Sequence, residues 1–247
     1  MIFLKNKDEL KSIDYACKVV RDTLFHVEEN ITVGITPLEL DKLAEEFILS
    51  KGAIPGFKGL YGFPNTICVS IDDAVVHGVP SNKELKDGQI VSIDVGSIYK
   101  DFYGDHAKTF CIGNVNDQTR KLVNTTKQCL MLAIDNVKPG KRVGDVGYCV
   151  QSYAEKNDFS VVRELVGHGI GKSLHEEPQI PNYGLKNTGI QFKEGMCLAI
   201  EPMLNIGTHE IITKDDGWTI CTKDGLPSAH FEHTVTVTEK GVKILTI

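Results

Sequence analysis

The chain has 247 residues, of which 41% are hydrophobic and 24% are charged, and its formal net charge is −6. A chain of this length can bury a large core, and we expect residues 1–247 to form a single α+β domain. The acidic balance argues against a specific nucleic-acid-binding surface. No run of eighteen apolar residues occurs, so we expect no membrane span.

The N-terminus and the cysteines both predict a cytoplasmic protein. The apolar stretch Met1–Leu4 is followed at once by Lys5 and is too short for a signal peptide. The seven cysteines are odd in number, widely spread and never in a Cys-x-x-Cys pair. This usage is typical of reduced thiols in a cytosolic core, not of a disulfide framework or a zinc ribbon.

Two helices are predicted near the N-terminus, each with the residue pattern of a capping box. The first is predicted to begin at Asn6, which has Glu9 three residues further on, and its apolar residues recur at steps of three and four as far as Val27. The second is predicted to begin at Thr36 and to end at Gly52. Short strands are then predicted over 66–71 and 75–78.

A hairpin is predicted from two strands over 89–95 and 105–111. Residues that alternate along a strand share one face of the sheet, so this pairing predicts that Asp94 and Asp105 lie side by side. Two more helices follow the hairpin, and the last hundred residues return to strands separated by glycine-containing turns. Helices followed by strands, twice over, favour a chain of two similar halves.

Five residues with metal-binding side chains lie in short apolar or glycine-rich runs, where a charge is costly. No Arg or Lys of a predicted strand lies beside them as a partner. Four carboxylates and one imidazole that converge on one point would carry a formal charge near −4, which suits two divalent ions better than one. These residues are Asp94, Asp105, His168, Glu201 and Glu232.

The order and local setting of these five residues resemble those of the methionine aminopeptidases of type I, the short bacterial kind. The similar segments extend over essentially the whole chain and include Val76-His77-Gly-Val-Pro, Gly167-His168-Gly-Ile-Gly, Leu174-His175-Glu-Glu-Pro and Phe231-Glu232-His-Thr. The resemblance implies the two-halved pita-bread fold, with a metal pair inside a curved antiparallel sheet. It also implies the removal of an initiator methionine from nascent polypeptides with a small second residue.

The resemblance assigns the five residues to two metal ions. It implies that Asp94 holds one ion, that His168 and Glu201 hold the other, and that Asp105 and Glu232 bridge both. Two cations that share a water would lower its pKa towards neutral, and the resemblance implies that the resulting hydroxide is the nucleophile for the first peptide bond. Oxygen ligands with one imidazole suit Fe²⁺, Mn²⁺ or Co²⁺ at least as well as Zn²⁺.

Two further histidines and an apolar pocket follow from the same resemblance. It implies that His77 contacts the substrate backbone, that His175 stabilises the tetrahedral intermediate, and that Glu201 also moves a proton. Three residues are expected to line the methionine side-chain pocket, where sulfur and aromatic edges suit a thioether: Cys68, Phe63 and Trp218. At Leu60 and Leu174 the chain departs from the family's frequent aromatic residues, which predicts a looser pocket.

Three other histidines, His106, His230 and His233, are adjacent or close to ligands. By strand alternation we expect all three to point away from the metals, as packing groups. An Xaa-Pro peptidase or prolidase on the same fold, and a non-catalytic binding protein on that fold, are the alternative functions. We expect a monomer that contacts nascent chains and, weakly, the ribosome exit region through its folded domain.

Overall fold

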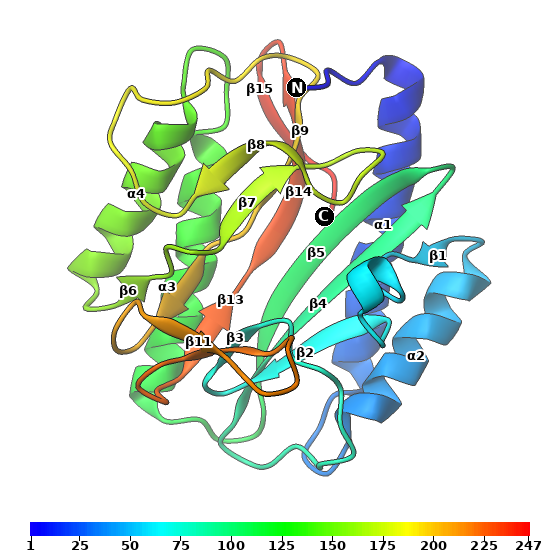
Figure 1. Ribbon diagram of the computed structural model, residues 1–247, viewed down its shortest axis with the longest axis vertical. Helices are drawn as coiled ribbons and strands as arrows, with labels where there is room; N and C mark the ends of the chain where they lie inside the picture. The colour runs from blue at the N-terminus through cyan, green and yellow to red at the C-terminus, as the bar shows by residue number, and fades with distance from the viewer.

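The computed structural model describes all 247 residues, which form four α-helices and fifteen strands. Figure 1 shows α1 and α2 behind one half of a curved sheet and α3 and α4 behind the other half. The helices are α1 (Lys7–Asn30), α2 (Pro37–Ser50), α3 (Asp117–Asp135) and α4 (Val143–Lys156), and a 3₁₀ turn covers Leu60–Gly62. The strands are β1 (Ile54–Pro55), β2 (Ile67–Ile71), β3 (Ala74–Val76), β4 (Ile90–Tyr99), β5 (Phe102–Cys111), β6 (Ser160–Val161), β7 (Val166–Gly169), β8 (Glu176–Pro181), β9 (Cys197–Ile200), β10 (Met203–Asn205), β11 (Ile211–Thr213), β12 (Ile220–Thr222), β13 (Ser228–His230), β14 (Glu232–Thr238) and β15 (Gly241–Ile244).

Both predicted N-terminal capping boxes are present. The Asn6 side chain accepts hydrogen bonds from the first turn of α1, and the Glu9 carboxylate accepts one from the Asn6 backbone. Thr36 and Glu39 do the same at the start of α2. These caps satisfy amide groups that have no partner within the helix, so local sequence alone sets where each helix begins.

The main sheet has nine antiparallel strands, with the path β1-β4-β5-β14-β9-β7-β8 and with β2 and β15 attached to β4 and β14. The hairpin of β4 and β5 is longer than the sequence predicted, because it runs on to the two-residue turn at Lys100 and Asp101. Both turn residues have positive φ, as this kind of tight hairpin turn requires. The two halves of the chain meet where β5 pairs with β14.

Two small sheets complete the concave side. One contains β13, β10 and β6, and the other contains β11, β12 and β3. The strand β3 follows β2 after a tight turn but pairs with β12, from the other half of the chain. This long-range pairing places the residue that follows β3, His77, in front of the main sheet.

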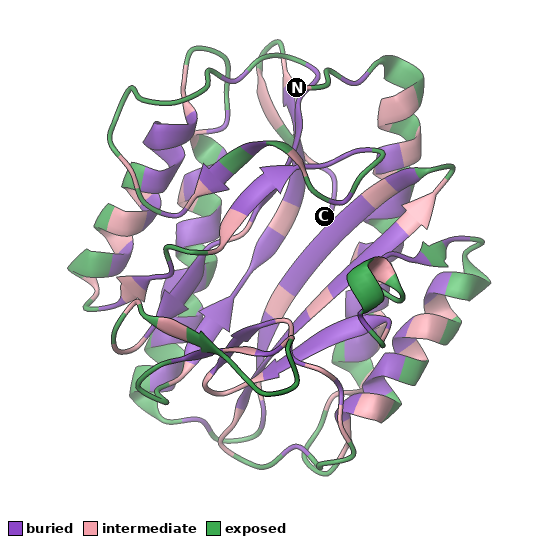
Figure 2. Ribbon diagram, viewed as in Figure 1, coloured by how far each residue is buried: buried purple, intermediate pink, exposed green.

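Apolar residues fill the space between the helices and the back of the sheet. One cluster joins α3 and α4 to the C-terminal strands, and a second joins α1 and α2 to β2 and β4. Figure 2 shows the buried strands in the centre and the exposed residues on the outer helix faces and the connecting loops. No helix combines the length and the hydropathy that a membrane crossing requires.

Candidate metal centre

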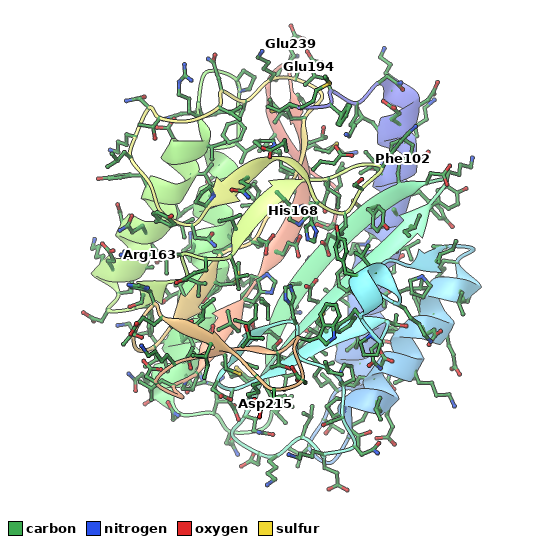
Figure 3. The ribbon with its side chains drawn as sticks, viewed as in Figure 1. Phe102, Arg163, His168, Glu194, Asp215 and Glu239 are labelled. Carbon is green, nitrogen blue, oxygen red and sulfur yellow. The ribbon has the colours of Figure 1, made fainter.

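A cavity of about 120 Å³ opens on the concave face of the main sheet. The ten predicted site residues line it, together with Leu60 and Leu174, which the sequence placed at the methionine pocket, and two residues that the sequence did not assign to the site. The ten are Phe63, Cys68, His77, Asp94, Asp105, His168, His175, Glu201, Trp218 and Glu232, and the two unassigned residues are Phe57 and Tyr61. Figure 3 labels His168, which lies near the middle of the molecule.

The β4–β5 hairpin brings the two aspartates to one face of the sheet. In the observed register Asp94 lies opposite Ala107, and Asp105 lies opposite Gly96. The carboxylates are therefore diagonal neighbours, and not a directly opposed pair. Gly96 has no side chain that would separate them, and a Cβ there would overlap the ring of Phe57.

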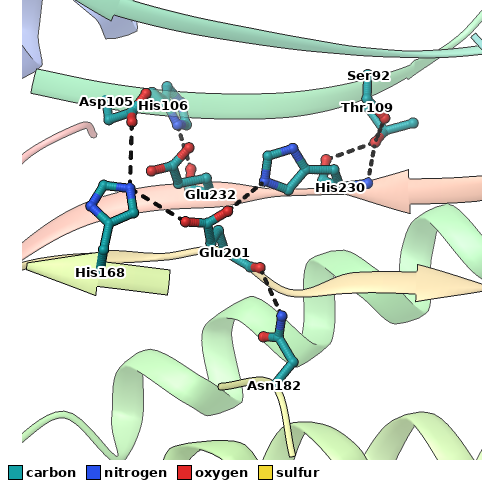
Figure 4. A network of polar contacts seen from close by, with 9 residues as sticks. All are labelled: Ser92, Asp105, His106, Thr109, His168, Asn182, Glu201, His230 and Glu232. Atoms are coloured by element: carbon teal, nitrogen blue, oxygen red, sulfur yellow. Dashed lines mark hydrogen bonds and ion pairs between the residues drawn. The ribbon is translucent and has the colours of Figure 1, made fainter. Parts of the chain in front are cut away.

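The other three predicted ligands come from the second half of the chain. Glu232 begins β14, Glu201 directly follows β9, and His168 lies on β7. The Nε2 atom of His168 is 3.4 Å from Glu201 Oε1 and 3.9 Å from Asp105 Oδ2. Figure 4 shows these side chains pointing toward one another from adjacent strands.

Four of the predicted ligands form a carboxylate cluster: Asp94, Asp105, Glu201 and Glu232. No Lys or Arg side chain pairs with this cluster, since every ion-pair contact of its members is to a histidine. One oxygen each of Asp94, Asp105 and Glu232 is buried without a hydrogen-bond partner. Burial raises the pKa of Asp94 to about 7. Burial and the neighbouring carboxylates raise the pKa of Asp105, Glu201 and Glu232 well above their usual range.

These observations fit a site for divalent cations. Ligand atoms of Asp105, His168 and Glu232 all lie within 4.8 Å of one another. Isolated buried carboxylates are costly, and cations would offset both the lost hydration and the mutual repulsion. Four carboxylates and one imidazole form a mainly oxygen donor set, and this set suits Fe²⁺, Mn²⁺ and Co²⁺ as well as Zn²⁺.

The imidazole of His168 is held in its neutral form. Its Nδ1 lies 2.9 Å from the carbonyl oxygen of Gly169, so Nδ1 carries the proton and Nε2 faces the carboxylates with a free lone pair. Burial, followed by the nearby His175, lowers the pKa of His168 to about 3. The ring therefore needs no deprotonation before it binds a cation at neutral pH.

The two predicted catalytic histidines both line the cavity and come from different parts of the chain. His77 has a φ of 58° and is followed by Gly78, where a Cβ would lie 2.2 Å from the Val69 carbonyl oxygen. This close approach holds His77 over the cavity. His175 lies in the loop between β7 and β8, and its ring centroid is 4.6 Å from that of His168. Burial lowers the pKa of both His77 and His175.

The prediction that His230 points away from the ligands is wrong. Its Nε2 lies 3.8 Å from Glu201 Oε2 and has no hydrogen-bond partner. The reason is positional: His230 is two residues before Glu232, and this spacing brings both side chains to the same side of the chain. His106 and His233 do point away, and their rings stack with centroids 4.7 Å apart.

The apolar part of the cavity is built around an aromatic pair. The rings of Phe63 and Trp218 meet edge to face, with centroids 5.3 Å apart. Trp218 is held in its loop by Asp216, whose carboxylate accepts hydrogen bonds from the backbone of Trp218 and Thr219. The buried thiol of Cys68 lies on β2, opposite Asp94 on β4. The apolar pocket and the carboxylate cluster thus share one cavity.

Comparison with known proteins agrees with this site. The model of metallopeptidase family M24 matches residues 11–239. A methionine aminopeptidase of Clostridium perfringens is 46% identical over 247 residues, with 100% of this chain and 99% of the relative covered. The crystal structure of the Thermotoga maritima methionine aminopeptidase superposes with a TM-score of 0.98 at 44% identity, covering 100% of this chain and 99% of that one.

A prolidase of Pyrococcus furiosus shares the fold but is less similar in sequence and in structure. Its TM-score is 0.82 at 25% identity, and the match covers 99% of this chain and 65% of the prolidase. The fold and the site together define a metallopeptidase with an antiparallel pita-bread sheet. The chain belongs to metallopeptidase family M24 and, within it, to the methionine aminopeptidases, as the resemblance of its motifs predicted.

Proposed function

We propose that this protein removes the N-terminal methionine from nascent polypeptides whose second residue is small. The observation that carries this proposal is the shared cavity, in which Phe63, Cys68 and Trp218 lie beside the carboxylate cluster. A thioether packs well against aromatic edges and sulfur. A methionine side chain in the apolar pocket would therefore place the first peptide bond at the cluster.

The five ligands would divide between two divalent ions. Asp94 is proposed to hold one ion, His168 and Glu201 the other, and Asp105 and Glu232 both. In support, Asp105 belongs to both halves of the cluster: it neighbours Asp94 across the hairpin and His168 across the cavity. When bound, the two cations (Fe²⁺, Mn²⁺, Co²⁺ or Zn²⁺) would lower the pKa of a shared water so that it can act as the nucleophile.

The histidines are proposed to act on the scissile peptide bond. Both pKa values are lowered by burial, so each ring is neutral at pH 7 and has one N–H to donate. His175 would donate to the carbonyl oxygen as negative charge develops on it, which is the kind of stabilisation that an oxyanion hole provides. His77 would hold the substrate backbone, and Glu201 would pass a proton to the leaving amine.

The cavity also sets limits on the substrate. A substrate whose amino group binds at a metal ion would have no place for a formyl or acetyl group on that amine. The second residue would pass between His77 and the cluster, where a wide side chain displaces the carbonyl. We further propose a cytoplasmic monomer with nascent chains as substrates, a weak contact with the ribosome exit region, and neither a specific nucleic acid nor a membrane as partner.

Two measurements test this proposal together. Metal analysis of anaerobically purified protein gives the identity and number of bound ions, and release of free methionine from Met-Gly-Met gives the activity. Ala-Pro serves as the comparison substrate, because a prolidase-like enzyme would cleave it. Preferential cleavage of Ala-Pro would contradict the proposal, and so would full activity in protein stripped of metal by a chelator.

A further inference from the structure

A buried ion pair outside the metal centre joins residues 1–6, the segment before α1, to the loop that carries His175. The Lys5 ammonium is 2.5 Å from Glu176 Oε2, and the two side chains are only 4% and 9% exposed. Removing two charges from water is costly unless the pair is well placed and its remaining groups are hydrogen-bonded. The proposed reaction makes no use of either residue.

Glu176 closes the loop on its other side. While Oε2 meets Lys5, Oε1 accepts a hydrogen bond of 2.9 Å from the backbone N–H of Lys172 and a longer one of 3.4 Å from that of Ser173. Glu176 is also the first residue of β8 and directly follows His175. The carboxylate therefore holds both ends of the short segment from which His175 enters the cavity.

Two glycines lie against Lys5, one beside its side chain and one beside its backbone. A Cβ on Gly171 would lie 2.5 Å from Glu176 Oε1 and 2.5 Å from the Lys5 ammonium, so the ion pair packs directly on bare backbone. The backbone N–H of Lys5 donates to the carbonyl oxygen of Gly195, at 2.8 Å. Gly195 lies in the turn before β9, the strand that leads to Glu201.

We propose that Lys5 is a positioning residue for the reaction: through Glu176 it fixes the loop that aims His175 at the scissile carbonyl. The inference rests on the proposed role of His175. Lys5 touches neither substrate nor metal ligand, but it is anchored by its backbone to the β9 turn and by its side chain to the His175 loop. Lys5 thus fixes the position of the His175 loop relative to the turn before β9.

Removing both charges at once gives a clean perturbation, because it leaves no unpaired charge in the core. The double variant Lys5→Met/Glu176→Gln should keep its metal ions and lower kcat by roughly tenfold or more, since a displacement of about an ångström at a reacting centre costs on the order of 10²-fold. KM should change little, because His175 acts in the transition state. The matched control is Asp8→Asn/Lys11→Met, which removes an exposed ion pair of the same region and should leave kcat unchanged.

A double-mutant cycle with His175→Ala shows whether Lys5 acts through His175. In the His175→Ala background the Lys5→Met/Glu176→Gln change should cause no further loss of kcat. The NMR signal of the His175 imidazole should also shift in the Lys5→Met/Glu176→Gln protein and stay unshifted in the control. Gly171→Ala, which keeps both charges and displaces the pair, should reproduce the kcat loss.

Two results would overturn the inference: an equal loss of kcat with and without His175, or a His175 signal that does not move. If the double variant fails to fold, Gly171→Ala and its His175 signal decide the question in the same way. Full activity of His175→Ala alone would instead refute the proposed role of His175, and the NMR signal would then decide whether Lys5 positions the loop.

Discussion

The imidazole rings of His168 and His175 meet edge to face, with centroids 4.6 Å apart and planes at 81°. His168, a proposed metal ligand, lies on β7, whereas His175 lies in the loop before β8. This contact places a neutral N–H donor directly beside the carboxylate cluster. The two proposed roles differ accordingly, since His168 contacts the carboxylates and His175 makes no ion-pair contact with any of them.

Replacing His175 by Ala should reduce turnover without removing metal. We expect kcat to fall by roughly 10²-fold or more, as for the loss of one oxyanion-type donor, while metal content stays the same. The measurement is steady-state methionine release alongside elemental analysis. His26→Ala, on α1 where the half-buried ring stacks on Phe47 of α2, is the control and should retain full activity. An unchanged rate in His175→Ala would return this residue to a packing role.

Replacing Glu232 by Gln should weaken metal binding and abolish most turnover with little loss of fold. Burial and the charges of Asp105, Asp94 and Glu201 raise the pKa of Glu232, so a neutral amide relieves repulsion in the metal-free protein. We expect the metal-free melting temperature to be at least as high as in the unaltered chain, and fewer ions to be bound per chain. Glu239→Gln changes an exposed residue that Figure 3 shows far from His168 and serves as control. Unaltered turnover with both ions retained would refute the bridging role.

The size of the second residue should decide which peptides are cleaved. Met-Gly and Met-Ala peptides should release methionine, whereas Met-Ile and Met-Leu should react on the order of 10²-fold more slowly or not at all, because a displaced carbonyl loses alignment with the nucleophile. Formyl-Met peptides should be inert. Equal cleavage of Met-Gly and Met-Ile, or efficient release from a blocked peptide, would contradict the assignment.

In protein stripped of its metal ions, the free energy of unfolding should fall as the pH rises above 7. Burial raises the pKa of Asp94 to about 7, and that of Asp105, Glu201 and Glu232 well above its usual range. The metal-free folded state therefore binds more protons than the unfolded chain, whose carboxylates ionise near pH 4. The free energy of unfolding then decreases as pH rises from about 4 through the raised values.

The buried histidines act in the opposite direction, but only at lower pH. Burial lowers the pKa of His106, His168 and His230 to about 3, so the unfolded chain binds the extra protons below about pH 6.5. Between pH 7 and 8 only the loss of stability caused by the carboxylates therefore remains. Calorimetry should show a melting temperature that falls over this range in chelator-treated protein and stays level with saturating Mn²⁺. A metal-free melting temperature that rises from pH 7 to 8 would contradict this balance.

The sequence by itself determined the features that rest on local interactions. Asn6 and Thr36 predicted where α1 and α2 begin, because a cap depends on residues within one turn. Alternation along β4 and β5 predicted that Asp94 and Asp105 share a face. The local settings of Asp94, Asp105, His168, Glu201 and Glu232 singled out the five residues that the cavity brings together, and motifs along the whole chain predicted the family.

Only the tertiary structure decided the relationships between distant segments. Pairing of β3 with β12 places His77 over the sheet, and no local pattern specifies that partner. The position of His230 beside Glu201 and the burial of Lys5 against Glu176 also escaped the sequence. Each contact joins segments far apart in the chain, and the approach of these segments is set by the shared core and the sheet register.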